Sequence, residues 1–249
     1  TSGRLRPPKN ARELGTLEHI TLMKKIGKYE VIRELGKGAT SVVYEALDPF
    51  VNRHVAVKVV LADALSHKEH GRRYRKLFLT EASLAGKLSH PHIVSIYDAV
   101  ADEEASYIVM EYVDGTTLEQ YSRPDRLLSI NKVIEIIFKC TKALDYAAKH
   151  GVIHRDIKPA NIMLSGENDI KITDFGAALT AAAQTTQITG IGSPAYMSPE
   201  QIEGENATAS SDLYSFGVTV YEMLTGQLPF KGETPLAIMR AIADKPVPP

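Results

Sequence analysis

Two short polar runs in the second half of the chain have the residue types needed to hold a metal ion and accept a proton. In the run 154–161, HRDIKPAN, the carboxylate of Asp156 and the amide of Asn161 lie in one loop that a proline restrains. Such a loop can bring a carboxylate to a substrate hydroxyl and an amide oxygen to a metal ion. Asp174 follows the strand-like run 170–173, and a carboxylate at the end of a strand suits a Mg²⁺ ion that bridges phosphate groups. The two runs therefore predict a site that acts on metal-bound phosphate groups.

The first half of the chain carries residues that could bind the same phosphates. Gly36 and Gly38 lack a Cβ, so backbone N–H groups beside them can approach phosphate oxygens, although glycine-rich hairpins also occur simply as turns. Lys58 stands in the Val-rich run 55–59. It could reach water from an edge strand, or it could be held for phosphates by a carboxylate. Glu81, in the helix expected next, is the candidate carboxylate.

Periodicity predicts the elements that must position these residues. Alternating or Val-rich runs in the first half predict strands, and one run predicts a helix whose basic side fits a solvated face better than a binding patch. The expected strands are a hairpin over 29–48 and single strands over 54–61, 93–100 and 106–112, and the expected helix covers 68–88. The residues next to Glu81, namely Ala82, Leu84 and Ala85, predict that this part of the helix faces the core.

The second half is mainly helical by the same criterion. Apolar residues recur at helical spacing over 131–149 and again over 211–225, so each helix should bury one face. The expected buried residues are Val133, Ile136, Ile137, Cys140, Leu144 and Ala147 in the first helix, and Leu213, Phe216, Val220 and Leu224 in the second. Cys140 lies on the apolar face, and no neighbour would lower its pKa, so it should be a core residue and not a nucleophile.

Composition excludes several classes of protein. The 249 residues carry a net charge of −1 with a pI of about 6.7, which does not indicate a nucleic-acid partner. The single cysteine permits no internal disulfide and fits a reducing compartment, so we expect a cytoplasmic location. No apolar run reaches the length of a membrane-spanning helix, and no secretory signal opens the sequence. A membrane anchor beyond the ends of the chain is left open.

Residues 1–28 differ from the rest because they are strongly basic and contain a Pro-Pro pair. A flexible extension is the favoured interpretation, and a docking arm for a membrane surface or a partner is the alternative.

In order and spacing, these motifs resemble those of the eukaryotic-type protein kinase superfamily, over about residues 29–249. Two more runs agree with that family: SPE at 198–200 and DLYSFG at 212–217. The strings HRDIKPANIM, YIVMEYVDGTTL and AYMSPEQ are most similar to bacterial serine/threonine kinases. Lys158 and Ser193 are typical of kinases that act on serine and threonine.

The resemblance implies an α+β, bilobal fold. A small antiparallel β-sheet lobe with one key helix would cover 29–110, and a larger, mainly helical lobe would cover 111–249. The family continues with further C-terminal helices and an arginine that pairs with Glu200. Glu200 is therefore expected to be buried without its partner, and the large lobe is expected to expose apolar surface.

The resemblance also implies the roles of the catalytic residues. Lys58 would contact the ATP phosphates and pair with Glu81. Asp156 would orient the substrate hydroxyl and accept its proton, and Lys158 would neutralise charge on the transferred group. Asn161 and Asp174 would hold Mg²⁺, for which Mn²⁺ is a possible substitute.

The same resemblance implies a nucleotide site between the lobes. Met110 would be the gatekeeper, Glu111 to Val113 the hinge that reads adenine through backbone groups, and Ala56 and Met163 the residues that sandwich the ring. The full set of expected nucleotide-binding residues is Gly36, Lys37, Gly38, Val43, Ala56, Lys58, Met110, Glu111, Val113, Met163 and Asp174.

The implied function is transfer of the γ-phosphoryl group of ATP to serine or threonine hydroxyls of proteins. Autophosphorylation is expected at Thr185, Thr186 or Thr189, with a homodimer as a possible partner for reaction in trans. The alternatives are an inactive scaffold, including a pseudokinase or an inactive truncated form, and a small-molecule phosphotransferase. The presence of Lys58, Asp156 and Asp174 argues against the scaffold, and the SPE run argues against the phosphotransferase.

Overall fold

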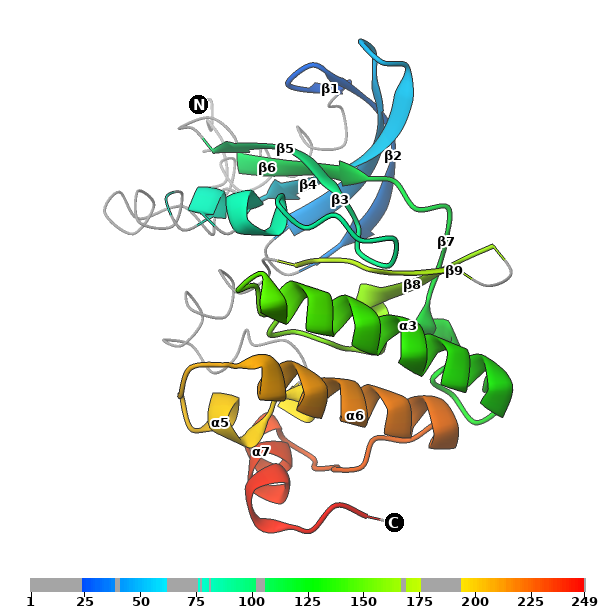
Figure 1. Ribbon diagram of the computed structural model, residues 1–249, viewed down its shortest axis with the longest axis vertical. Helices are drawn as coiled ribbons and strands as arrows, with labels where there is room; N and C mark the ends of the chain where they lie inside the picture. The colour runs from blue at the N-terminus through cyan, green and yellow to red at the C-terminus, as the bar shows by residue number, and fades with distance from the viewer. Residues whose placement is uncertain are drawn as a thin grey trace, which may run out of the picture.

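The computed structural model describes residues 24–38, 41–61, 76, 78–80, 82–101, 106–166, 169–175 and 194–248. A twisted sheet occupies one end of the molecule and a group of helices the other (Figure 1). The sheet is antiparallel, with strand order β1-β2-β3-β4-β6-β5. Its strands are β1 (Lys25–Ile26), β2 (Tyr29–Lys37), β3 (Ser41–Asp48), β4 (Arg53–Val60), β5 (Ile96–Ala101) and β6 (Ser106–Glu111). The strands predicted from the sequence are therefore confirmed, except that β5 begins later than expected.

The sheet begins earlier than the sequence indicated. Residues 24–28 were expected to end a flexible extension, yet β1 pairs with β2 and Ile26 is buried in the core of the sheet. Ile26 packs in one cluster with Tyr29, Val57 and Val109. The apolar side chain explains the difference, because burying it offsets the entropy of ordering a short strand. The rest of the extension lies outside the described residues.

The helix expected over 68–88 is described only in part. Residues 76, 78–80 and 82–85 are helical, and the chain turns at 86–87, so the helix ends before the expected boundary. Ala82 and Ala85 are buried, as predicted. Leu84 is exposed, contrary to the prediction, because it lies on the opposite face from the two alanines.

Two long helices form the centre of the other lobe (Figure 1). α3 (Ile130–Lys149) begins at Ser129, whose side chain accepts a hydrogen bond from the amide of Lys132. α6 (Ala209–Thr225) begins with a capping box and ends at Gly226 in a left-handed conformation. Their facing sides pack in the main core of the lobe, which includes Ile136 and Phe216. The shorter helices are α5 (Pro199–Ile202) and α7 (Pro235–Asp244), and the 3₁₀ turns are η2 (Leu118–Tyr121), η3 (Pro159–Asn161) and η4 (Pro194–Tyr196).

The apolar face predicted for α6 is only partly correct. Phe216 is buried, whereas Leu213 and Leu224 are 55% and 48% exposed. The buried positions at the start of the helix are polar and include Ser211, Asp212 and Ser215. Helical spacing of apolar residues failed at the start of α6 because its buried face there binds a loop through polar groups, as described below, whereas Phe216 and Met223 pack in the apolar core.

Cys140 is fully buried in the core of the helical lobe, as predicted. Burial raises the pKa of its thiol to about 12. Because the thiolate is the reactive form, we expect the folded protein to give no reaction with a thiol-specific disulfide reagent at about pH 8. The absorbance of the released reagent should correspond to one thiol per chain after unfolding in urea and to none before it. Rapid labelling of the folded protein would contradict this packing.

A second, three-stranded sheet lies at the boundary of the two lobes (Figure 1). It consists of β7 (Gly115–Thr117), β8 (Ile162–Ser165) and β9 (Asp169–Ile172), in that order. Ile172 in β9 also exchanges backbone hydrogen bonds with His92 and Val94, which precede β5. This sheet ties the end of β9 to both lobes and so positions the residues that follow it. No helix among the described residues combines the length and the hydropathy that crossing a bilayer requires.

Candidate active site

The loop before η3 is held by one buried carboxylate from α6. Asp212 is 4% exposed, and its two oxygens accept the backbone N–H groups of His154 at 2.8 Å and Arg155 at 2.7 Å. Burial raises the pKa of Asp212, while these two amide donors act in the opposite direction. Arg155 has a φ of 69°, so the chain turns sharply just before Asp156. Asp212 thereby fixes the backbone that presents Asp156.

His154 connects this loop to the end of β9. Its ring is fully buried, Nε2 donates to the carbonyl of Thr173 at 2.7 Å, and Nδ1 accepts the amide of Asp156 at 3.2 Å. The ring also meets Phe175 edge-on, with the centroids 4.7 Å apart. One side chain therefore sets the position of Asp156 relative to the segment that carries Asp174.

Asp156, Lys158 and Asn161 form one hydrogen-bonded group. Lys158 Nζ lies 2.7 Å from Asp156 Oδ2, and Asn161 Nδ2 donates to the same oxygen at 3.0 Å and to the Asp156 carbonyl at 2.7 Å. Because both donors converge on Oδ2, the other carboxylate oxygen is left to accept from a substrate hydroxyl. Using Nδ2 in this way also leaves the amide oxygen of Asn161 as a possible metal ligand.

Asp174 pairs with Lys58 across the lobes. The distance from Lys58 Nζ to Asp174 Oδ1 is 2.5 Å, and both side chains keep about a quarter of their surface exposed. The φ of Asp174 is 63°, a strained value for a residue other than glycine. The sequence predicted Glu81 as the partner of Lys58. Glu81 lies outside the described residues, and the partner that the structure describes is Asp174.

The Lys58–Asp174 pair should make stability depend on pH. Burial alone raises the pKa of Asp174, but the charge and hydrogen bond of Lys58 outweigh it, so the pKa lies below its ordinary value of 3.8. A carboxyl with a lowered pKa stabilises the fold above its ordinary titration range, and this contribution is lost as the pH falls through the lowered value. Lys58→Met should therefore reduce the free energy of unfolding at about pH 7 and reduce it less at about pH 3.

Urea unfolding of the wild type and Lys58→Met at both pH values measures this difference. The matched control is Lys149→Met, which breaks an exposed ion pair with Asp145 and should change stability little at either pH. An equal loss from Lys58→Met at both pH values would show that the lysine stabilises the fold through packing and not through Asp174.

The residues expected to surround adenine form one apolar cluster between the sheet lobe and β8. Ala56 in β4 is directly opposite Met110 in β6, and both pack with Val113. The cluster also contains residues from β3, β6, β8 and the segment before β5. Its members are Val43, Ala56, Val94, Ile108, Met110, Val113 and Met163. The structure thus brings together all five apolar residues in the expected nucleotide-binding set, and it adds Val94 and Ile108, which sequence reasoning missed.

Glu111 is bound by other side chains at the end of β6. Its carboxylate pairs with Lys171 at 2.8 Å and accepts the amide of Ser95 at 3.2 Å. The side chain is therefore occupied, which leaves only backbone groups for a role in the hinge. Within the described chain, no group accepts the backbone N–H of Val113. A free N–H at this position can donate to a ring nitrogen of a base.

The glycine-rich hairpin leaves open space beside its glycines. A Cβ on Gly36 would meet no atom within 4 Å, and one on Gly38 would make only ordinary contacts with Ser41. The amide of Gly38 donates to the carbonyl of Ser41 at 2.8 Å, so Ser41, which departs from the family glycine pattern, still closes the turn through its backbone. Lys37 is exposed at the end of β2. The described fold does not itself require the glycines, which is compatible with their serving a bound phosphate.

These donors and acceptors fit a magnesium nucleotide. The carboxylate of Asp174 and the amide oxygen of Asn161 are oxygen ligands of the kind Mg²⁺ prefers, and Lys58 supplies a cation beside them. Asn161 and Asp174 are close because the amide of Thr173 donates to the Asn161 carbonyl at 2.9 Å. Among the described residues, no group of three or more His, Cys, Asp or Glu side chains could hold a metal by itself.

The carboxylate of Glu200 differs from the prediction in its burial and in its hydrogen-bond partner. It was predicted to be buried without a partner, but it is only half-buried and accepts the hydroxyl of Ser211 at 2.5 Å. That hydrogen bond lowers its pKa. The neighbouring Gln201 contributes a contact that the sequence did not indicate, because Nε2 donates to the carbonyl of Arg155 at 2.9 Å. The SPE segment therefore braces the catalytic loop through Gln201.

Sequence reasoning missed two of the residues that hold this site. Asp212 was noted only as part of the DLYSFG run, and His154 only as part of HRDIKPAN. For Asp212 the signal was a carboxylate at the start of a helix that should be buried, since such a group needs partners. Three expected phosphorylation sites, Thr185, Thr186 and Thr189, lie outside the described residues, as does Ser193.

A family model of the protein kinase domain matches residues 29–247. The chain belongs to the protein kinase domain family, and the predicted bilobal α+β fold is confirmed. It is similar to bacterial members that are named as serine/threonine kinases. A probable serine/threonine-protein kinase of Clostridium acetobutylicum is 42% identical over 225 residues, which are 89% of this chain and 34% of the relative.

Two further relatives give the same result. Serine/threonine-protein kinase PknB of Mycolicibacterium smegmatis is 42% identical over 231 residues, 89% of this chain and 36% of that protein. Serine/threonine-protein kinase PrkC of Bacillus subtilis is 40% identical over 214 residues, 85% of this chain and 32% of that protein. The chain spans about a third of the length of these relatives.

Proposed function

We propose that this chain transfers the γ-phosphoryl group of ATP to serine or threonine hydroxyls of proteins. The observation that carries the proposal is the group formed by Asp156, Lys158 and Asn161, with a second carboxylate, Asp174, held beside Lys58. The names of the relatives support the same activity and do not favour an inactive scaffold.

The residues have separable roles in the proposed reaction. Asp156 accepts the proton of the substrate hydroxyl as the hydroxyl oxygen bonds to the γ-phosphorus and the bond to ADP breaks. Lys158 stabilises negative charge on the group in transfer, and its contact with Asp156 keeps it next to the acceptor oxygen. When bound, Mg²⁺ supplies positive charge to the phosphate oxygens, and Asn161 and Asp174 would hold it, with Mn²⁺ as a possible substitute.

The remaining residues bind and orient the nucleotide. The apolar cluster around Ala56 and Met110 would take the adenine ring, and Lys58 would contact the phosphates. In this proposal Lys58 exchanges part of its interaction with Asp174 for phosphate oxygens. The need for ATP and the lone buried thiol fit a cytoplasmic location.

Phosphorylation of three matched peptides tests the proposal directly. Incubation with labelled Mg-ATP and peptides that differ only in Ser, Thr or Tyr at one position should label the Ser and Thr peptides and not the Tyr peptide. Labelling of the Tyr peptide alone, or hydrolysis of ATP with no labelled peptide, would contradict it.

We also propose autophosphorylation in trans, between two copies of the chain, at Thr185, Thr186 or Thr189. These residues follow Asp174 in sequence, and the exposed residue Arg155 directly precedes Asp156 and could pair with a phosphate. Mass spectrometry of the protein after incubation with Mg-ATP should locate phosphate in this segment. The rate per molecule should rise with protein concentration, and a concentration-independent rate would exclude the reaction in trans.

A further inference from the structure

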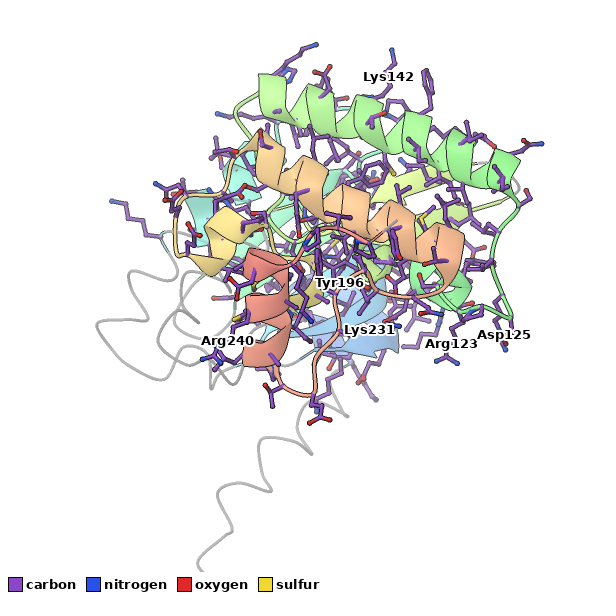
Figure 2. All side chains as sticks on the ribbon, turned by 90° about the horizontal axis from the view of Figure 1, so that it is seen from below. Arg123, Asp125, Lys142, Tyr196, Lys231 and Arg240 are labelled. Carbon is purple, nitrogen blue, oxygen red and sulfur yellow. The ribbon has the colours of Figure 1, made fainter. Side chains whose placement is uncertain are left out.

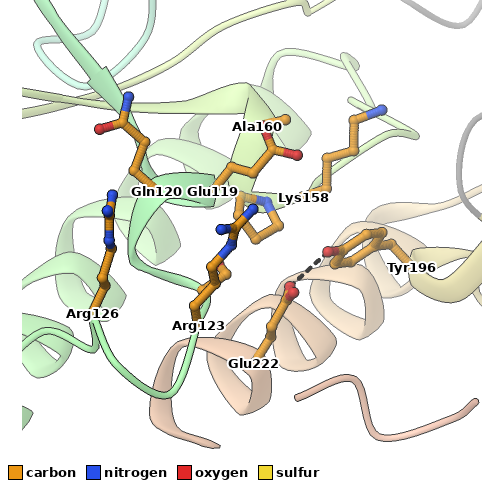
Figure 3. Close-up of a pocket in the computed structure, with 10 residues that line it drawn as sticks. Glu119, Gln120, Arg123, Arg126, Lys158, Ala160, Tyr196 and Glu222 are labelled. Carbon is orange, nitrogen blue, oxygen red and sulfur yellow. Dashed lines mark hydrogen bonds between the residues drawn. The ribbon is translucent and has the colours of Figure 1, made fainter. Parts of the chain in front are cut away.

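A cavity of about 810 Å³ opens beside the catalytic loop. Lys158 and Ala160 form one wall, and η2 with the turn that follows it forms another. Tyr196 in η4 and Glu222 in α6 complete the lining (Figure 3). Because Lys158 contacts Asp156 at 2.7 Å, a polypeptide that presents a hydroxyl to Asp156 would pass next to this cavity. The charges in the cavity then act on the residues that flank that hydroxyl.

Two arginines of the turn after η2 face the cavity, and few nearby negative charges compensate their positive charges. Both Arg123 and Arg126 are exposed. Arg126 is 3.8 Å from Asp125, with both side chains largely in solvent, so this ion pair contributes little. Arg123 has no ion pair with any residue that the structure describes. Figure 2 shows Arg123 at the outer edge of the molecule, below Tyr196 and the C-terminal end of α6.

Of the two carboxylates of the cavity, Glu222 is already engaged and Glu119 is exposed. Glu222 accepts the hydroxyl of Tyr196 at 2.6 Å. Burial and the nearby charge of Glu119 raise the pKa of Glu222, although the hydroxyl of Tyr196 acts in the opposite direction. Figure 3 shows the side chain of Arg123 extending into the space between Glu119 and Glu222. The positive charge of Arg123 therefore lies in the same cavity as the two carboxylates and offsets part of their attraction for a cation of the substrate.

The backbone fixes the turn that carries these arginines. Gly226, at the end of α6, has a φ of 68° and lies so close to the turn that a Cβ on it would be 2.5 Å from the nitrogen of Pro124. The amide of Arg126 donates to the carbonyl of Arg123 at 2.9 Å, which closes the turn. Arg123 is thus placed by direct contact between the turn and α6, and not by a flexible loop.

We propose that Arg123 and Arg126 make this cavity select acidic over basic side chains in the protein substrate, close to the phosphorylated hydroxyl. The occupant is the carboxylate of an Asp or Glu in an extended segment of the substrate. This inference rests on the proposed function and adds a substrate class to it. Guanidinium groups suit this task because their planar donors match the two oxygens of a carboxylate.

The test uses one Ser/Thr acceptor peptide in which a single Glu, Gln or Lys is moved through the positions on either side of the acceptor. At one or more of these positions, kcat/KM for the Glu peptide should exceed that for the Gln peptide by about three- to tenfold, and the Lys peptide should be the poorest. The Glu preference should decrease as salt is raised, because exposed charges are screened.

Variants identify the residues responsible. The double variant Arg123→Ala with Arg126→Ala should lose the Glu preference, improve the Lys peptide and leave kcat/KM for the Gln peptide nearly unchanged. The matched control, Arg240→Ala, removes an exposed arginine of α7 that lies away from the turn (Figure 2), and the Glu preference should remain. Gly226→Ala should weaken the preference without removing either charge, because it displaces the turn.

The outcomes separate this inference from the proposed function. If no peptide is phosphorylated, including the Gln series, the proposed kinase activity fails and the inference fails with it. If the Gln peptides are phosphorylated but the Glu peptides have no advantage, or the Lys peptides are preferred, the activity stands and the inference is overturned. A Glu preference that survives the double variant would also overturn it, because some other surface would be the source.

Discussion

Asp156→Asn is expected to lower kcat for phosphoryl transfer by about 10²- to 10⁴-fold while leaving ATP affinity almost unchanged. The amide cannot accept the proton of the substrate hydroxyl, and it also replaces the oxygen on which Lys158 and Asn161 converge. The nucleotide cluster around Ala56 and Met110 is built by other elements, so binding of ATP should persist. Steady-state kinetics with a peptide substrate, together with ATP titration by calorimetry, measures both quantities.

Asp145→Asn is a suitable control for this substitution. Asp145 is an exposed carboxylate on α3 whose ion-pair partner in the described part of the chain is Lys149, and its loss should change neither kcat nor ATP affinity. If Asp156→Asn retained more than a tenth of the wild-type kcat, Asp156 would not be the base. If it lost ATP binding as well, the variant would report a distorted site and not a missing proton acceptor.

Asp212→Ala is expected to have the largest effect on stability. It removes the acceptor for two amides, the buried N–H of His154 and the part-buried N–H of Arg155, and each unsatisfied N–H costs about 1–3 kcal/mol. The free energy of unfolding should therefore fall by about 2–6 kcal/mol, which corresponds to a drop in Tm of about 4–24 °C for a domain of this size. Differential scanning calorimetry measures the drop.

A variant of the same shape, Asp212→Asn, separates the loss of a hydrogen-bond acceptor from the loss of side-chain volume. Asp212→Asn keeps the shape and one acceptor oxygen but points an NH₂ group at the second amide, so its Tm should also fall. Asp145→Ala should stay close to the wild type, because it removes only an exposed ion pair. If Asp212→Asn proved as stable as the wild type, Asp212 would stabilise the loop by packing and not by accepting two hydrogen bonds.

Within single segments, the sequence was informative because neighbouring residues share one geometry. The loop 154–161 places Asp156, Lys158 and Asn161 within a few residues of one another, so their convergence follows from a short stretch of backbone. The apolar face of α3 was predictable for the same reason, since its register is fixed by helical spacing. The strands of the small sheet were also predictable, because alternation reports which side is buried.

Prediction failed where a contact spans distant parts of the chain. Leu213 and Leu224 fitted an apolar stripe, but both are exposed, and the first turns of α6 bury polar residues because Asp212 binds a loop 58 residues before it. Ile26 was assigned to a flexible extension because residues 1–28 are strongly basic and contain a Pro-Pro pair, yet pairing with β2 orders it. Glu200 was expected to lack a partner, and Ser211 supplies one.

The sequence by itself determined which residues we propose for the chemistry, their order, and the family to which the chain belongs. Only the tertiary structure decided which groups meet: Lys58 with Asp174 over 116 residues, His154 with Asp212, and Arg123 with the cavity beside Lys158. The physical reason is that covalent geometry fixes distances within a loop or a helix, whereas contacts between segments depend on how the whole core packs.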